Sequence, residues 1–390
     1  MLPLPEHLRR VERLQEILRG RELAGALLLH CVDIYYLAGT CQNGALYVPS
    51  SGDPVLIIRK SIARARAESL VADLRPFPSS RDLGAALGAR GHIGATFDAV
   101  PAAILDWWRN QLPAAKVVDI SRPMRELRSV KSPTELATLR DGGARLAAVL
   151  ALVPALLREG LSEVDLSSEI EFRLRRAGSL GSPRLRGFNS ELFMGLALAG
   201  ESAAAPGYFD GPVIGRGLHP SYPQGASERS IRRNEPIFLD WTAVFGGYVV
   251  DMTRVGVVGD LSQDLARALD VALAIQGELT HGLRPGLTGE ALWERARAMA
   301  EDAGLGECFM GPPGDQARFV GHGVGLELDE LPVLAPGQSA PLVAGQVVAV
   351  EPKFVFPGRG AIGVENTWVV AEGGGEKITG TLADTILRVA

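Results

Sequence analysis

The hydrophobic residues in the first third of the chain fall into short runs that alternate with helical patterns. Leu8, Val11 and Leu14, followed by Leu18, recur at the spacing of one helix face, so the first twenty residues are expected to form an amphipathic helix. Apolar runs bounded by turn residues predict short strands. The expected strands lie at 24–29, 44–49, 53–59, 92–96 and 115–120, and further helices at 62–70 and 101–112. This alternation predicts a compact α/β domain over residues 1–125.

The stretch RPMRELRSVKSPTE (122–135) is charged, contains two prolines and ends in a helix-start signal. Ser132 precedes Pro133, and Glu135 follows in the first turn, as in a capped helix. We therefore expect a domain boundary here and a second domain over residues 126–390. Its helices are expected at 133–157, 162–177, 261–282 and 288–303, its strands at 236–244, 247–258, 345–356 and 361–371, and a Gly/Pro-rich region at 178–235. Paired strands with helices between them predict an α+β fold.

Composition narrows the class of protein without identifying it. The chain has 390 residues, of which 46% are hydrophobic and 22% charged, with a net charge of −5, and its scattered basic residues exclude a nucleic-acid-binding face. The longest apolar run, twelve residues from 146, is too short for a membrane span, and charges interrupt the N-terminus where a signal peptide needs an apolar stretch. Cys31, Cys41 and Cys308 have no paired spacing, which fits a reducing compartment. We expect a cytoplasmic protein with neither nucleic-acid nor membrane partners.

Four carboxylates interrupt predicted strands of the second domain. They are Asp240 in PIFLDWTAV, Asp251 in YVVDMTR, Glu351 in QVVAVEPKF and Glu365 in AIGVENTWVV. A buried ionised carboxylate costs several kcal/mol unless a cation or hydrogen-bond donors compensate it. Four acids that are each satisfied separately would explain the pattern structurally. One acid per strand instead indicates that the four share a positive charge.

The spacing of the two aspartates favours a metal. Gly246–Gly247 lies midway between Asp240 and Asp251 and signals a hairpin, which brings the aspartates to about opposite positions on paired strands. Carboxylates that close repel each other unless a metal lies between them. His322, in FVGHGVG, is alone in a Gly-rich run and could be structural, but with the four acids it completes an oxygen-rich set. Such a set suits Mn²⁺ or Fe²⁺ and can hold Co²⁺ or Zn²⁺. The sequence predicts a site for two divalent metal ions, with Mn²⁺ preferred.

These five residues, in this order and spacing, resemble the pita-bread metallopeptidases, the family of methionine aminopeptidase, Xaa-Pro aminopeptidase, prolidase and creatinase. YYLAGT at 35–40 and LRSVKSPTELATLR resemble the creatinase-type N-terminal domain and its junction. The resemblance implies a pita-bread catalytic domain behind a smaller α/β domain. It also implies a metal-bound hydroxide that attacks a peptide bond, and a homodimer.

The resemblance further implies a role for each ligand. Asp240 would chelate one metal and Asp251 would bridge both; His322 and Glu351 would bind the second metal, and Glu365 would bridge again. Glu351 would also handle protons during catalysis, in agreement with the ability of a nearby carboxylate to relay the proton of a metal-activated water. Creatinase, a metal-free relative, lacks much of this set, so the complete set argues against metal-free chemistry.

The chain departs from the family pattern at the positions that usually hold substrate-side histidines. Those positions hold Pro223, with His219 nearby, then Arg318 and Asp329, and Gly363 stands where an arginine is common. An ionised aspartate only accepts hydrogen bonds, and would destabilise an oxyanion. Asp329 could act as a general base, orient an amine or pair with Arg318, whereas Arg318 could instead clamp a substrate carboxylate.

Loop residues 185–223 are expected to supply further substrate contacts, because loops at the mouth of a rigid scaffold carry binding residues. Candidates besides His219 are Asn189, Glu191, Tyr208 and Tyr222, each of which could equally make ordinary loop hydrogen bonds. Arg254 is expected to orient carboxylates rather than to bind substrate.

Three functions remain open from the sequence. The first is a metal-dependent Xaa-Pro aminopeptidase or dipeptidase. The second is a non-peptidic small-molecule amidohydrolase or metal-dependent lyase on the same scaffold, because three substrate-side histidines are replaced. The third is a metal-binding protein with little catalysis.

Overall fold

The computed structural model describes residues 3–390 and divides them into two compact units. The first comprises the chain up to Arg128 together with Arg186–Asn189, and the second comprises Ser129–Leu185 and Ser190–Ala390. The division falls within the charged stretch in which the sequence analysis placed the boundary. The return of Arg186–Asn189 to the first unit has no counterpart in the sequence prediction.

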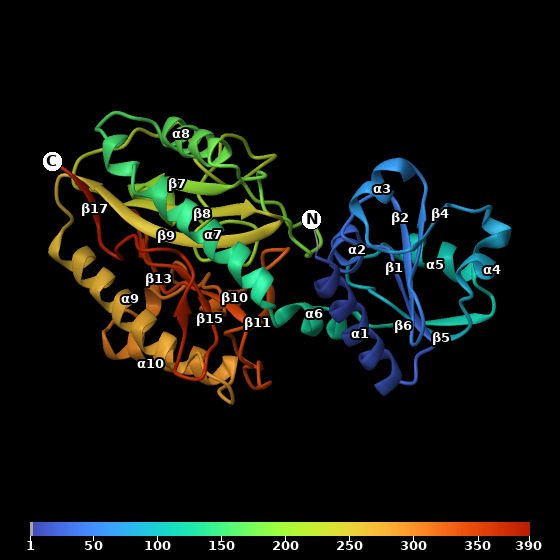
Figure 1. The fold of residues 1–390 in the computed structure, drawn as a ribbon. Helices are drawn as coiled ribbons and strands as arrows, with labels where there is room; N and C mark the ends of the chain where they lie inside the picture. The colour runs from blue at the N-terminus through green and yellow to red at the C-terminus, as the bar shows by residue number, and fades with distance from the viewer. Residues whose placement is uncertain (1–2) are drawn as a thin grey trace. The chain divides into compact units, whose positions relative to one another are not determined.

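The first unit is a six-stranded mixed sheet with helices around it (Figure 1). Strand β2 (Gly44–Pro49) pairs antiparallel with β1 (Gly25–Leu28) and with β3 (Val55–Ile58). The other neighbouring strands of this sheet pair parallel. Leu27, Ile57 and Trp108 are buried in its core. In the order β4-β3-β2-β1-β5-β6, the strands are Asp73–Pro76, Val55–Ile58, Gly44–Pro49, Gly25–Leu28, Gly91–Ala95 and Ala115–Asp119; the helices are α1 (Leu4–Gly20), α2 (Cys31–Ala38), α3 (Ile62–Glu68), α4 (Leu83–Leu87), α5 (Ala102–Gln111) and α6 (Ser121–Ser129), with a 3-10 turn at Ser80–Asp82.

The second unit is built on a four-stranded sheet, a five-stranded sheet and a two-stranded hairpin. The four-stranded sheet has the order β17-β9-β8-β7: Leu387–Val389, Tyr248–Val258, Ile237–Phe245 and Gly195–Ala199. The five-stranded sheet has the order β11-β10-β12-β15-β16: Glu330–Val333, Gly321–Gly323, Val347–Val350, Asn366–Val369 and Glu376–Lys377. The hairpin pairs β13 (Lys353–Phe356) with β14 (Gly360–Gly363).

Helices α7 (Pro133–Leu150) and α8 (Glu163–Arg176) pack on the four-stranded sheet, whereas α9 (Gln263–Gly282) packs on β12, β13 and β14 and α10 (Gly289–Asp302) packs on α9 (Figure 1). The start of α7 is capped as expected, since the Ser132 hydroxyl accepts from the Glu135 amide and the Glu135 carboxylate accepts from the Ser132 amide. The predicted helix 133–157 is too long. It ends at Leu150, and short 3-10 turns follow at Val153–Ala155 and, later in the chain, at Gly200–Ala204 and Gly306–Cys308.

The prediction of a single strand at 345–356 is also wrong, because the structure has two strands there. Pro352 separates β12 from β13, and since proline has no amide hydrogen to continue a ladder, the chain changes sheets there. The partner strand 361–371 divides likewise, into β14 and β15. Glu351 and Glu365 therefore lie at the two crossover points between the sheets.

The β8–β9 hairpin turns at Gly246–Gly247 as predicted, and both glycines have positive φ, 58° and 90°. The predicted direct opposition of the aspartates is wrong. Asp240 pairs with Thr253, and Asp251 pairs with Thr242. The two carboxylates therefore lie diagonally on one face of the ladder, where their separation leaves room for a cation.

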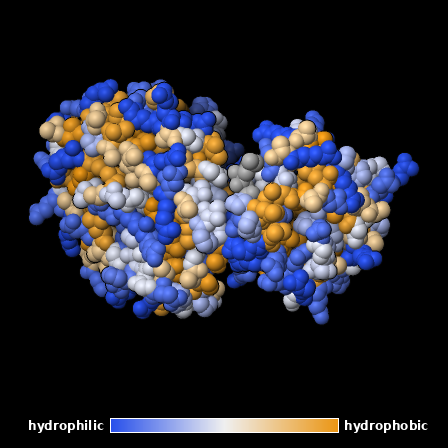
Figure 2. Space-filling view, in the orientation of Figure 1, coloured by the Kyte–Doolittle hydropathy of each residue, from blue (hydrophilic) through white to orange (hydrophobic). Residues whose placement is uncertain are grey.

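The face of the molecule in Figure 2 carries interspersed hydrophilic and hydrophobic residues over both units. Among residues 3–390, no helix is long and apolar enough to cross a membrane.

Candidate metal centre

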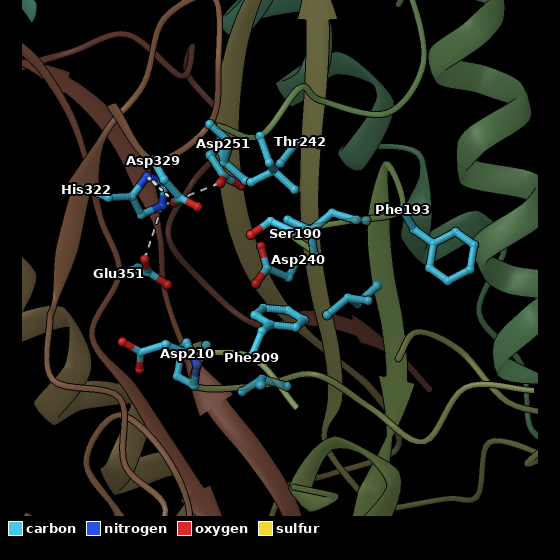
Figure 3. A pocket seen from close by; sticks show the side chains of 18 of the residues that line it. Ser190, Phe193, Phe209, Asp210, Asp240, Thr242, Asp251, His322, Asp329 and Glu351 are labelled. Atoms are coloured by element: carbon cyan, nitrogen blue, oxygen red, sulfur yellow. Dashed lines mark ion pairs between the residues drawn. The ribbon is translucent and has the colours of Figure 1, made fainter. Parts of the chain in front are cut away.

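The five residues singled out in the sequence meet in the second unit, where the strands of its two larger sheets approach one another. The Asp251 amide on β9 donates to the Thr367 hydroxyl oxygen of β15, and Glu365 forms a bridge with Thr253 of β9. His322 on β10 lies opposite Ala349 of β12, whose strand ends directly before Glu351. Backbone pairing thus brings four separate segments to one point, and Figure 3 shows the side chains of Asp251, His322 and Glu351 from three of them.

His322 is the centre of one half of the cluster. Its Nε2 lies 3.2 Å from Glu351 Oε1 and 3.9 Å from both Asp251 Oδ2 and Glu365 Oε1. Asp251, His322 and Glu365 each offer a ligand atom within 4.8 Å of the others, and all three are buried. Asp251 Oδ1 and Glu365 Oε1 are buried without a hydrogen-bond partner in the described structure. Because such oxygens are costly to bury, this half fits a divalent cation.

Lys353 is the centre of the other half. Its Nζ donates to Asp240 Oδ2 at 2.8 Å, to Glu351 Oε2 at 2.7 Å and to Glu365 Oε2 at 3.1 Å. Its side chain is only 3% exposed. Lys353 was not among the residues predicted from the sequence, although EPKF carries the same signal as the acids, a charge at the edge of an apolar strand.

The positive side chains of the cluster do not balance its four carboxylates equally. Burial raises the pKa of Glu351, but the Lys353 ammonium and the His322 ring lower it to about 2. Burial, together with the charges of Glu351 and Asp240, raises the pKa of Glu365 to about 7 despite Lys353. Burial and the charges of Glu365 and Asp240 raise the pKa of Asp251 well above its ordinary value. The deficit of positive charge therefore lies at Asp251 and Glu365, beside His322.

His322 is held from its other nitrogen. Nδ1 lies 3.2 Å from the Gly323 carbonyl oxygen and 3.5 Å from Asp329 Oδ1. Burial alone lowers the pKa of His322, but the bond to Glu351 and the charges of Asp329, Glu351 and Asp251 raise it well above its ordinary value. The contacts of Nδ1 with Gly323 and Asp329 fix the orientation of the ring, so that Nε2 faces the carboxylates.

A pocket of about 790 Å³, open to solvent, leads to the cluster (Figure 3). One wall is apolar, and Ser190, Glu191 and Asp210 add polar groups near it. Lys353 and His322 are the only basic side chains among its lining residues in the described structure. The apolar side chains of the lining are Leu185, Leu192, Phe193, Met194, Leu196, Phe209, Pro212, Val213, Phe319 and Leu328.

The other predicted substrate residues lie farther out. Arg318 and His219 are exposed and lie outside the pocket lining, and His219 Nδ1 contacts the Ser221 hydroxyl at 2.7 Å. Within the described residues Arg318 makes no ion pair with Asp329, so the pairing left open by the sequence is not formed. Tyr222 packs edge-on against Phe193 at 4.9 Å between ring centroids.

Of the remaining loop candidates, Glu191 lines the pocket, Tyr208 packs against Phe209, and Asn189 belongs to the first unit. Arg254 is buried and donates to the carbonyl oxygens of Thr253 and Glu365. It therefore holds the backbone that carries Glu365 in place. The carboxylate that it contacts is that of Asp384, at 2.6 Å, and not one of the four acids of the cluster.

Comparison with known proteins gives two family matches. Residues 137–372 match the metallopeptidase family M24, and residues 10–130 match the creatinase/prolidase N-terminal domain. A probable dipeptidase PepE of Mycobacterium tuberculosis is 27% identical over 90% of this chain and 88% of its own length. The Xaa-Pro dipeptidase of Pyrococcus furiosus is 22% identical over 95% of this chain and 98% of its own.

Solved structures agree in fold. The dipeptidase PepE from Mycobacterium ulcerans has a TM-score of 0.82 and 26% identity, with 99% of each chain covered. The Xaa-Pro dipeptidase from Bacillus anthracis has a TM-score of 0.83 and 24% identity, covering 98% of this chain and 100% of its own. The pita-bread architecture expected from the sequence is confirmed by these matches, together with the creatinase-type domain before it.

Proposed function

Because the chain belongs to metallopeptidase family M24, and is therefore a hydrolase of the metal-dependent peptidase type, we propose that it is a dipeptidase that acts on Xaa-Pro dipeptides. The observation that carries the proposal is the buried group of Asp251, His322, Glu365 and Glu351 at the floor of an open pocket. The non-peptidic and the catalytically silent alternatives are not favoured by the relatives, whose names describe dipeptidases.

The metal would be held by the carboxylates of Asp251, Glu351 and Glu365 and by Nε2 of His322. Mn²⁺ is the first choice for this oxygen-rich set with a single imidazole, ahead of Co²⁺, Zn²⁺ or Fe²⁺. A bound divalent cation supplies Lewis-acid polarisation of a carbonyl and activation of water at neutral pH.

Glu351 is proposed to move the proton. Lys353 and His322 hold its carboxylate by one oxygen each at the floor of the pocket, where it can contact a bound substrate or water. Asp329 is proposed as a positioning residue, because it faces His322 Nδ1 and favours the tautomer that leaves Nε2 unprotonated. This role replaces the general-base role considered from the sequence.

The pocket fits a small substrate with an apolar side chain and a positive amino terminus. Phe193 and Phe209 offer flat apolar surfaces for a proline ring, and Tyr222 supports Phe193 from behind. Glu191 and Asp210 add negative charge that attracts an ammonium group. Substrate contacts by Arg318 and His219 remain predictions, and their exposed positions give them no direct support.

A cytoplasmic location is proposed because no disulfide joins the cysteines among the described residues and Cys31 is exposed. Assembly as a homodimer also stays a prediction, which light scattering of the purified protein would test.

Hydrolysis of Xaa-Pro dipeptides by metal-stripped protein, before and after addition of Mn²⁺, tests the proposal. We expect activity only with metal, and a loss of at least about a hundredfold in Asp251→Asn. Asp264→Asn, at an exposed aspartate paired with Arg359, is the matched control and should keep its activity. Turnover of small amides, with none on dipeptides, would contradict the proposal and favour the non-peptidic alternative.

A further inference from the structure

The Lys353 ammonium lies where three carboxylates of the candidate centre converge, 2.7–3.1 Å from Asp240, Glu351 and Glu365. We propose that this site takes one divalent cation instead of two, and that the Lys353 ammonium is the built-in second positive charge. The inference rests on the proposed metal dependence, but it concerns the number of ions and the residue that sets it.

The ammonium occupies its position fully. Its three N–H donors are matched to three carboxylate oxygens, which leaves none unused. A metal ion bound to the same oxygens would need contacts of about 2.0–2.6 Å and would then lie against Nζ. Since an ammonium and a dication repel strongly at that range in a buried site, the two exclude each other.

The backbone is built to admit this side chain. Lys353 of β13 pairs directly with Gly363 of β14. A Cβ at position 363 would lie 2.7 Å from Lys353 Cγ, so any larger residue there would push the lysine stem away. Position 363 is also where the family resemblance led us to expect an arginine. The positive charge has thus moved to the opposite strand, and the glycine leaves the space that the lysine fills.

Burial also fixes the ammonium. The Lys353 side chain is 3% exposed, and its Nζ lies 5.6 Å from the centroid of the Phe238 ring, within cation–π range. A metal ion that displaced so buried a lysine would therefore do so at a cost in free energy.

The other half of the cluster keeps its capacity for a cation. Asp251 Oδ1 and Glu365 Oε1 have no hydrogen-bond partner among the described residues, and His322 Nε2 faces both carboxylates at 3.9 Å. Four ionised carboxylates carry four negative charges, of which one dication and the ammonium together offset three. Two dications beside the ammonium would leave a buried excess of positive charge.

Titration of metal-stripped protein with Mn²⁺, followed by electron paramagnetic resonance and by elemental analysis, tests the stoichiometry. We expect one Mn²⁺ per wild-type chain, with the hyperfine-split spectrum of an isolated ion. Lys353→Ala removes the ammonium and opens the second position, so it should bind two ions and show spin coupling between them. Lys131→Met, which removes an equally buried lysine that pairs with Glu330 at 3.0 Å, should still bind one.

Two ions in the wild-type chain would overturn the inference and leave the metal-dependent function intact. One ion in a folded Lys353→Ala protein would also overturn it, because the ammonium would not then be what excludes the second metal. No ion in the wild type, with hydrolysis that resists chelation, would overturn the proposed function itself. If Lys353→Ala does not fold, Lys353→Met keeps the volume of the stem, and the wild-type stoichiometry alone still decides between one ion and two.

Discussion

Replacement of Lys353 by methionine removes the ammonium but keeps an unbranched apolar stem. In metal-free protein the variant leaves Asp240, Glu351 and Glu365 without their shared donor, and removal of one partner from a buried ion pair costs about 3–5 kcal/mol. The lower end applies here, because Glu365, whose pKa burial raises to about 7, can take up a proton. We therefore expect metal-free Lys353→Met to lose about 3 kcal/mol in the free energy of unfolding of the second unit.

Metal should then stabilise the variant more than it stabilises the wild type. Saturation at a hundred times the dissociation constant adds about 2.7 kcal/mol for one site and about twice that for two. Hydrogen exchange of the β8 and β9 amides, with and without Mn²⁺, measures both effects in the second unit. Lys131→Met is the matched control, since it should lose comparable stability but gain from Mn²⁺ no more than the wild type. A metal-free Lys353→Met protein as stable as the wild type would refute the reasoning.

Two further predictions follow. Asp329→Asn should weaken Mn²⁺ binding by about 10–100-fold, because the carboxylate that faces His322 Nδ1 is lost; calorimetric titration measures this, and unchanged affinity would remove Asp329 from the site. In the first unit, burial raises the pKa of Asp33, but the bond to His30 and the charges of Arg128 and Arg186 lower it well below its ordinary value. This stability is present above the ordinary aspartate pKa of about 3.9 and is lost as pH falls toward the lowered folded value. Hydrogen exchange of the α2 amides should show that loss in the wild type, and a flatter profile in Asp33→Asn; equal profiles would contradict it.

Much of the fold was readable from the sequence because its signals are local. The capping box at Ser132 and the Gly246–Gly247 hairpin each depend on a few neighbouring residues, and both were predicted correctly. The four acids within apolar strands predicted the cluster, because one shared positive charge accounts for all of them together. The hairpin register was misplaced by two residues, because a two-residue turn at Gly246–Gly247 pairs Phe245 with Tyr248 and therefore Asp240 with Thr253.

The parts that the sequence did not reveal depend on contacts between distant segments. Lys353 lies two residues after Glu351, yet its role follows from Asp240 and Glu365 on other strands. Gly363 was noted only as a missing arginine, and its meaning appears once β13 and β14 are paired. A pair between Asp329 and Arg318 was one possibility left open, but Asp329, with φ at 57°, lies beside His322 Nδ1 instead. The hydrophobic periodicity of the sequence does not specify these contacts between distant segments.

An anomalous difference map, recorded at the manganese edge from crystals equilibrated with Mn²⁺, tests the account most directly. The account predicts one peak per chain, surrounded by Asp251, His322, Glu351 and Glu365, with the Lys353 ammonium still between Asp240 and Glu351. Two peaks with Lys353 displaced, or no peak at this position, would contradict it.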